Sequence, residues 1–176
     1  MPRTVSWCAV LLAAALVSGT RAEEPKKDAP AKPPTFKAPK GWDAVEGTKT
    51  DIVQVAARFK SGEGEKAVAV VVLGSAGEGG GVLANVNRWR AQVGLEALDP
   101  KAAMEAVQEI KVDGLPAFRI DATGPKVAGN PAPRVVGVIV KSSDTTWFIK
   151  MTGADAPVGD QKAAFDEFVK SIRFAK

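Results

Sequence analysis

The sequence predicts a single α+β domain over residues 41–176, built as an antiparallel β-sheet with helices packed on it. Three observations favour this fold class. Apolar runs with the two-residue period of strands are separated by turns rich in glycine and proline. The Asp113-Gly114 dipeptide can supply the positive φ angles of a two-residue hairpin turn. Strands joined by hairpins, with helices following groups of strands, are typical of an antiparallel sheet covered by helices.

The first half of this domain is expected to hold two strands and a helix. A short segment at residues 42–46 precedes strands at residues 52–59 and 67–73. The strand at 67–73 is almost continuously apolar, so we expect it to lie centrally in the sheet with both faces covered. A glycine-rich loop at residues 74–81 then leads to a helix at residues 82–93.

Capping residues delimit the helices of this region. Gly94 is suited to end the helix at 82–93, because glycine readily adopts the left-handed conformation found after helix ends. Asp99 and Pro100 are suited to begin a second short helix that continues through Met104, as its N-cap and its first residue.

The second half is expected to contribute two hairpins and a closing helix. Their predicted limits are strands at 107–112, 115–121, 134–141 and 145–151, a long loop at 123–133, and a helix at 158–172. Phe165 and Phe168 belong to a broad apolar arc on that helix, which predicts that it packs against the sheet.

The N-terminus is interpreted as an export signal followed by a tether. Residues 1–22 combine a positive charge at Arg3, a short apolar run and small residues before a cleavage point ahead of Glu23. Since the run is too short to span a bilayer, we expect a secreted or periplasmic mature form without a transmembrane anchor. Residues 23–40 alternate prolines with charges, which is typical of a solvated tether.

Composition excludes several function classes. The chain contains no histidine, and its one cysteine, Cys8, lies in the expected signal peptide. Mechanisms and metal sites that need an imidazole or a thiol are therefore excluded, and we expect no cofactor. Residues 41–176 carry 17 Lys and Arg against 17 Asp and Glu, so the domain is neutral overall. A neutral domain without a basic stripe in its sequence is not expected to bind nucleic acid.

Two segments and the order of the elements carry a resemblance to a known fold family. These are the strand Thr-Trp-Phe-Ile-Lys-Met-Thr-Gly at 146–153, the closing helix Phe-Asp-Glu-Phe-Val-Lys-Ser-Ile at 165–172, and the order of strands and helices. Together they resemble the PsbP/DcrB-like sandwich over residues 41–174. The stretch from Gly80 to Gln92 resembles uncharacterised secreted bacterial proteins, notably planctomycete-like ones. The resemblance implies a non-enzymatic domain that binds partners, and it implies no metal-linked role here because histidine is absent.

Two further sequence patterns give only weak evidence for a catalytic or ligand-binding site. The loop at 74–81 invites a phosphate-binding interpretation, but it lacks the Lys and Ser or Thr that end a P-loop, and its Glu78 would repel a phosphate. Paired carboxylates such as Asp113 and Asp121 could perform acid–base chemistry, although Asp113 is already explained by the hairpin turn.

The most informative candidate site is on the helix at 82–93. Asn85, Arg88 and Gln92 fall on one polar stripe, with Trp89 at its border, and such side chains suit recognition of a peptide or a sugar. The alternative is that they bond to nearby carbonyls at the rim of the core. We therefore expect an exported, non-catalytic binding or accessory domain of the cell envelope, whose partner is an unknown envelope protein or a small ligand. A carboxylate-dependent, hydrolase-like enzyme and a structural envelope component are the alternatives.

Overall fold

The computed structural model describes residues 32–46, 54–77, 79–142 and 144–175, and the expected signal peptide lies outside them. The strands are β1 (Asp43–Ala44), β2 (Gln54–Ser61), β3 (Val68–Ala76), β4 (Gln108–Val112), β5 (Leu115–Thr123), β6 (Pro133–Lys141) and β7 (Thr145–Ala154). The helices are α1 (Gly81–Gln92), α2 (Pro100–Glu105) and α3 (Asp155–Ser171), with a 3-10 turn, η1 (Gly64–Lys66), between β2 and β3.

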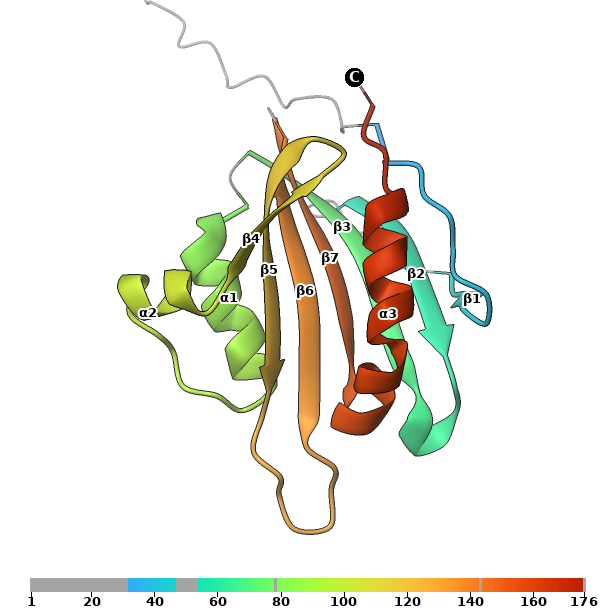
Figure 1. The fold of residues 1–176 in the computed structure, drawn as a ribbon, viewed down its shortest axis with the longest axis vertical. Helices are drawn as coiled ribbons and strands as arrows, with labels where there is room; N and C mark the ends of the chain where they lie inside the picture. Colours follow the sequence, from blue (N-terminus) through green and yellow to red (C-terminus); the bar gives the residue numbers. More distant parts are fainter. Residues whose placement is uncertain (1–31, 47–53, 78, 143, 176) are drawn as a thin grey trace, which may run out of the picture.

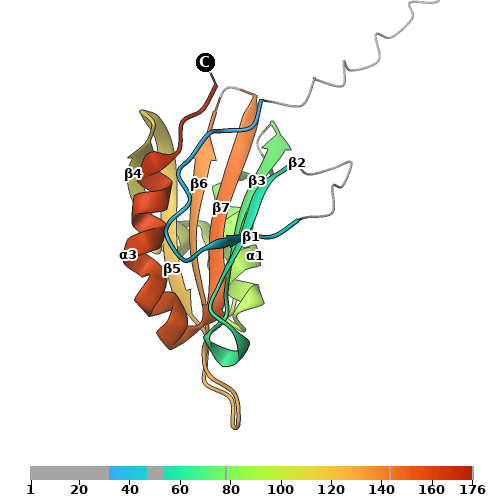
Figure 2. The same cartoon turned by 90° about the vertical axis from the view of Figure 1, so that its right-hand side faces the viewer.

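The described strands form a seven-stranded sheet in the order β1-β2-β3-β7-β6-β5-β4. All neighbouring strands are antiparallel. Helix α3 lies along one face of the sheet, and α1 with α2 lies on the other (Figures 1 and 2). The predicted α+β class and the antiparallel sheet are therefore confirmed.

Turn and cap residues act where the sequence predicted them. Asp113 and Gly114 have φ angles of 50° and 82°, and they join β4 to β5. The Asp99 side chain accepts a hydrogen bond of 2.9 Å from the Ala102 backbone, so it caps α2. Gly94 follows α1 with a φ angle of 76°. In each case the local chemistry of the residue was sufficient to specify the backbone.

The start of α3 was predicted three residues too late. The helix begins at Asp155, so Pro157 lies in its first turn, where a missing backbone N–H removes no intrahelical bond. Asp155 also places a negative charge at the helix N-terminus, which the helix dipole favours.

Each face of the sheet carries its own apolar core. The α3 face holds the larger core, which includes Val70, Val138, Ile149, Phe165 and Phe168. The α1 face holds a smaller core around Trp89, with residues from α1, α2, β5, β6 and β7. Two cores of unequal size mean that one face of the sheet is less completely covered than the other.

The expectation that the strand at 67–73 has both faces covered is wrong. Val68, Val70 and Val72 are buried on the α3 face, but Ala69 is exposed and Val71 only half-buried on the other. The fully covered strand is β6, where residues 135–140 are all buried. Helix α1 packs over β5, β6 and β7, and it leaves the β2–β3 side of its face open.

Part of the segment interpreted as a tether packs on the domain. Thr35 and Arg173 exchange two backbone hydrogen bonds of 2.9 and 2.8 Å. The ring of Phe36 packs against Phe59 and Phe168, with centroid distances of 5.8 and 5.3 Å. Contacts with the fold therefore begin ahead of Gly41, the expected start of the domain. Composition alone did not predict this, because a single aromatic ring in a proline-rich segment provides the apolar contact.

Candidate functional site

Asn85, the first residue of the predicted stripe, is buried and acts within the fold. Its side-chain amide donates to the Gly79 and Gly81 carbonyls at 2.8 and 2.7 Å, and its Oδ1 accepts from Arg88 Nη1 at 2.7 Å. The residue at the N-cap of α1, Gly80, has no side chain to offer. Asn85 therefore ties the glycine-rich loop to the start of the helix.

Trp89 also belongs to the core. Its side chain is 4% exposed and meets Phe148 edge to face, with ring centroids 6.3 Å apart. Gly137 on β6 makes room for it, because a Cβ at that position would overlap the indole ring. The expectation that most of the Trp89 ring is buried is confirmed.

The other two residues of the stripe face outward. Arg88 and Gln92 are exposed, and Gln92 Oε1 accepts a hydrogen bond of 2.8 Å from Lys150 Nζ on β7. The structure thus separates the four predicted site residues into a buried pair and an exposed pair, and of the exposed pair Gln92 contacts the sheet at Lys150.

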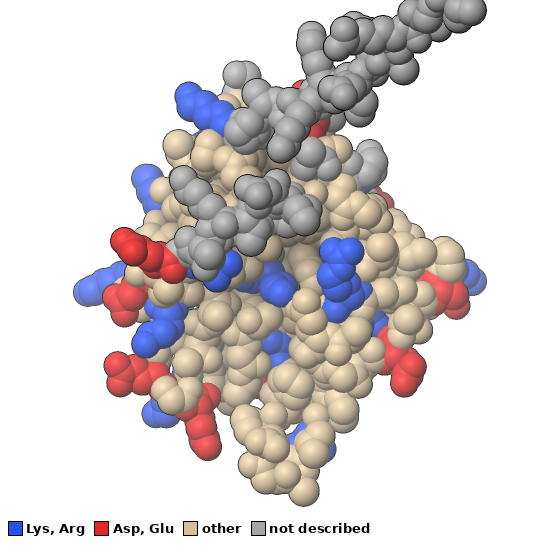
Figure 3. Space-filling view, turned by 180° about the vertical axis from the view of Figure 1, so that it is seen from behind, with Lys and Arg blue, Asp and Glu red and all other residues tan. Residues whose placement is uncertain are grey.

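Strand register places two further cations on that uncovered part. Val71 on β3 pairs with Arg58 on β2 and with Lys150 on β7, so all three side chains point to the α1 face. The open strip, as we name it, consists of Arg58 and Lys60 on β2, Ala69 and Val71 on β3, and Lys150 and Thr152 on β7. Figure 3 views this face: Lys and Arg side chains lie across its middle, and Asp and Glu side chains lie toward its rim.

Two cations of the open strip, Arg58 and Lys150, lack acidic partners among the described residues. Neither Arg58 nor Lys150 forms an ion pair there, and β2, β3 and β7 contain no Asp or Glu. The Arg58 Nε is buried without a hydrogen-bond partner in the described part of the chain. Burial lowers the pKa of the Lys150 ammonium, because desolvation disfavours its charged form. Lys60 differs, since Asp43 lies opposite it on β1.

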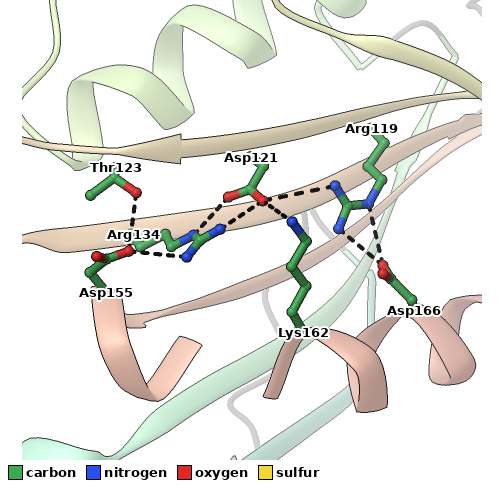
Figure 4. Close-up of polar contacts among 7 residues, drawn as sticks. All are labelled: Arg119, Asp121, Thr123, Arg134, Asp155, Lys162 and Asp166. Atoms are coloured by element: carbon green, nitrogen blue, oxygen red, sulfur yellow. Dashed lines mark hydrogen bonds and ion pairs between the residues drawn. The ribbon is translucent and has the colours of Figure 1, made fainter. Parts of the chain in front are cut away.

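The α3 face shows the opposite arrangement, a paired cluster in which each cation meets a carboxylate (Figure 4). Its members are Arg119, Asp121, Arg134, Asp155, Lys162 and Asp166. Arg134 holds Asp121 with two hydrogen bonds of 2.7 and 2.9 Å, and Lys162 Nζ lies 2.8 Å from the same carboxylate. Neutralised charges of this kind orient α3 on the sheet and leave little attraction for a ligand.

The electrostatics of Asp121 do not favour acid–base catalysis. Burial alone would raise the pKa of Asp121, but hydrogen bonds and charges from Arg134 and Lys162 outweigh it and lower the pKa to about 2. Asp113, its proposed partner, instead accepts from the Phe174 backbone at 3.0 Å and lies 3.6 Å from Arg173 Nε. The two carboxylates therefore make separate structural contacts. A general acid needs a pKa near the working pH, and the lowered pKa of Asp121 is far from it.

The glycine-rich loop is held by side chains from within the fold. Besides Asn85, Thr146 Oγ1 donates to the Gly77 carbonyl at 2.7 Å. Strand β3 also continues to Ala76, so the loop is shorter than the predicted span of 74–81. The backbone conformation explains the glycines, since Gly79 and Gly80 have φ angles of 56° and 88°, which favour glycine.

Sequence reasoning missed Arg58 and Lys150. A signal was present, because each is the one charged residue of a predicted strand. Such a cation costs free energy when half-buried without a partner, which marks it for attention. The sequence does not show the pairing register of β2, β3 and β7, which brings Arg58 and Lys150 onto one face of the sheet.

Comparisons with known proteins identify the fold but not the function. No family model and no curated protein matches the chain. Among solved structures, LpqN of Mycobacterium tuberculosis, a protein involved in cell envelope biogenesis, has a TM-score of 0.54 at 10% identity, over 85% of this chain and 88% of that one. The cyanobacterial PsbP of Synechocystis has a TM-score of 0.51 at 13% identity, over 80% of this chain and 85% of that one.

A third similar structure, from Bacteroides thetaiotaomicron, has a TM-score of 0.46 at 9% identity. The alignment covers 80% of this chain but only 44% of that chain, and it supports no further conclusion. No comparison supports the expected likeness to planctomycete-like proteins. In the described part of the chain, no helix is long and apolar enough to cross a membrane. The likeness to the cyanobacterial protein shows that the chain has a PsbP-like fold.

Proposed function

We propose that this chain is an exported, non-catalytic binding domain of the cell envelope, and that its ligand lies on the open strip beside α1. The observation that carries the proposal is the contrast between the two faces of the sheet. Cations on the α3 face are neutralised in the paired cluster, whereas Arg58 and Lys150 on the open strip have no acidic partner among the described residues.

Half-burying two cations that have no acidic partner among the described residues costs free energy, and the one hydrogen bond from Lys150 to Gln92 offsets only part of that cost. A bound partner that supplies the missing acceptors would offset that cost. The sheet floor of Ala69 and Val71 offers apolar contact beside the cations, and Gln92 on α1 contacts Lys150 at its border. This combination of apolar floor and polar border is typical of a recognition surface.

The envelope setting rests on two weaker supports. The N-terminal residues have the features of a secretory signal. The structurally similar LpqN is involved in cell envelope biogenesis. Neither names a ligand, and a shared fold hosts varied roles.

Site-specific crosslinking in native cells tests the proposal. A photoreactive residue replaces Ala69 on the open strip or, as the matched control, Ala163, an exposed alanine on α3 on the other side of the sheet. We expect an adduct from Ala69 that disappears when Arg58→Gln and Lys150→Gln are added, and none from Ala163. Equal adducts from both positions, or an Ala69 adduct that survives the double substitution, would contradict the proposal.

A further inference from the structure

The chemistry of the open strip specifies what it recognises, if the proposed function holds. We infer that the strip binds an extended acidic segment of a partner protein, whose carboxylates are held by Arg58 and Lys150 across Val71. The inference rests on charge complementarity, on the spacing of the two cations, and on the shape of the surface between them.

Charge restricts the ligand first. Arg58 presents guanidinium donors that are not used within the described residues, and one of them, Nε, is buried. A guanidinium is a planar set of donors that matches a carboxylate with two parallel hydrogen bonds. Lys150 adds a second ammonium, held toward α1 by its hydrogen bond to Gln92. Two positive charges without an acidic partner among the described residues favour an anionic ligand over a neutral one.

Spacing then favours more than one anionic group. Arg58 and Lys150 flank Val71 on neighbouring strands, so their Cα atoms lie two strand spacings apart, about 10 Å. In an extended peptide, side chains on one face recur every two residues, about 7 Å apart. The long, flexible side chains of arginine and lysine can converge by the remaining few ångströms. Two alternate acidic residues can therefore engage both cations at once.

Shape favours an extended segment over a small molecule. Small-molecule sites are concave and enclose most of the ligand surface. The open strip is instead the outer surface of three neighbouring strands, where Ala69 is exposed and Val71 half-buried, and α1 borders it through Gln92. An extended chain can lie along such a surface and contact the floor with the residues between its acids.

Binding of short peptides to the exported chain tests the inference. Hexaglutamate is the probe, and hexaglutamine is its uncharged counterpart. We expect hexaglutamate to shift backbone amide resonances of β2, β3 and β7, and we expect Arg58→Gln or Lys150→Gln to weaken its affinity at least tenfold. Lys170→Gln removes the same charge from the far side of α3, at a side chain that is 70% exposed, and should leave the affinity unchanged.

Three results would overturn the inference. An equal loss of affinity in Lys170→Gln would mean that only net charge matters. No loss in either strip variant would exclude the two cations as the site. Tighter binding to phosphatidylglycerol vesicles than to hexaglutamate, through the same two residues, would replace the acidic peptide by an anionic lipid surface.

The same probe separates this inference from the proposed function. Hexaglutamate should compete with the crosslinked adduct formed from Ala69. If the adduct forms and depends on Arg58 and Lys150 but hexaglutamate does not reduce it, the acidic-peptide inference is wrong and the binding function stands. If no adduct forms at Ala69, the binding function itself fails.

Discussion

At the scale of single residues, neighbouring positions on α1 have different roles. Asn85 is buried and donates to one loop carbonyl and to the first carbonyl of α1, while Gln92, two turns further along the same stripe, is exposed and contacts Lys150. Helical periodicity places both on one stripe, but depth beneath the surface depends on how the helix is tilted on the sheet. The role of each residue follows from its burial and not from its periodicity.

Asn85→Ala should lower the free energy of unfolding by about 1–3 kcal/mol, because it removes two donors from backbone carbonyls and leaves Arg88 without its acceptor. The free energy is measured by urea unfolding. Gln92→Ala is the matched control, and since its side chain is exposed we expect a change within about 0.5 kcal/mol. Equal effects of the two substitutions would mean that Asn85 does not anchor the loop.

Asp121 should make the stability of the fold depend on pH on the acid side. Its pKa falls from 3.8 to about 2 on folding, so its carboxylate binds fewer protons in the folded state than in the unfolded one. The contribution, about 2 kcal/mol, is complete above the unfolded pKa and is lost as pH falls toward 2. Asp121→Asn should therefore destabilise the protein at pH 7 and flatten the decline in stability between pH 5 and 2. An unaltered acid limb in urea titrations would show that other carboxylates dominate it.

At the scale of elements, the two main helices differ in how much of the sheet they cover. α3 has 17 residues and packs on the larger core, whereas α1 has 12 and leaves the β2–β3 side of its face open. A sheet twists, so one short helix cannot follow all seven strands. The open strip is the consequence of this unequal cover.

The segment around Phe36 packs against the core on the α3 face. Phe36→Ala should lower the free energy of unfolding by about 2 kcal/mol, because the ring fills a position between Phe59 and Phe168. Lys32→Ala, in the same segment but exposed, serves as the control and should change stability little. Thermal melting of both variants measures the difference, and similar melting temperatures would assign the segment to a tether after all.

The elements were largely predictable because their signals are local. Asp113-Gly114 specifies a turn and Asp99-Pro100 a helix start through their own backbone preferences. Errors arose where tertiary packing decides. The apolar run at 67–73 was assigned two covered faces, but α1 packs further along the sheet and Ala69 stays exposed. The site was less predictable, because Arg58 and Lys150 come onto one face, on either side of Val71, only through a strand register that neither segment encodes.

At the scale of the whole molecule, the domain has no net charge, but its charged side chains are arranged differently on the two faces of the sheet. The α3 face holds paired carboxylates and cations, whereas Arg58 and Lys150 on the α1 face have no acidic partner in the part of the chain that the structure describes. The equal totals of 17 and 17 conceal this difference, because net charge carries no information about position. A basic surface therefore arises without a basic sequence.

Export is the whole-molecule property most directly open to measurement. The signal features predict a mature protein that begins at Glu23. N-terminal sequencing and intact mass of the protein released from native cells should both give this start. A retained Met1, or an added lipid mass, would contradict export and release.

The backbone pairing of Thr35 with Arg173 has a consequence for how the chain could be cut and rejoined. Their mutual hydrogen bonds hold the two ends of the described fold side by side. A short linker between the ends should permit a circular permutant, with new termini opened in the exposed β5–β6 loop at residues 126–130. We expect this permutant to fold with the same sheet, as judged by amide resonance dispersion. The new termini would lie at the end of the sheet opposite to the present C-terminus (Figure 1). A surface or a label could then be attached at either end of the sheet without changing the residues of the open strip.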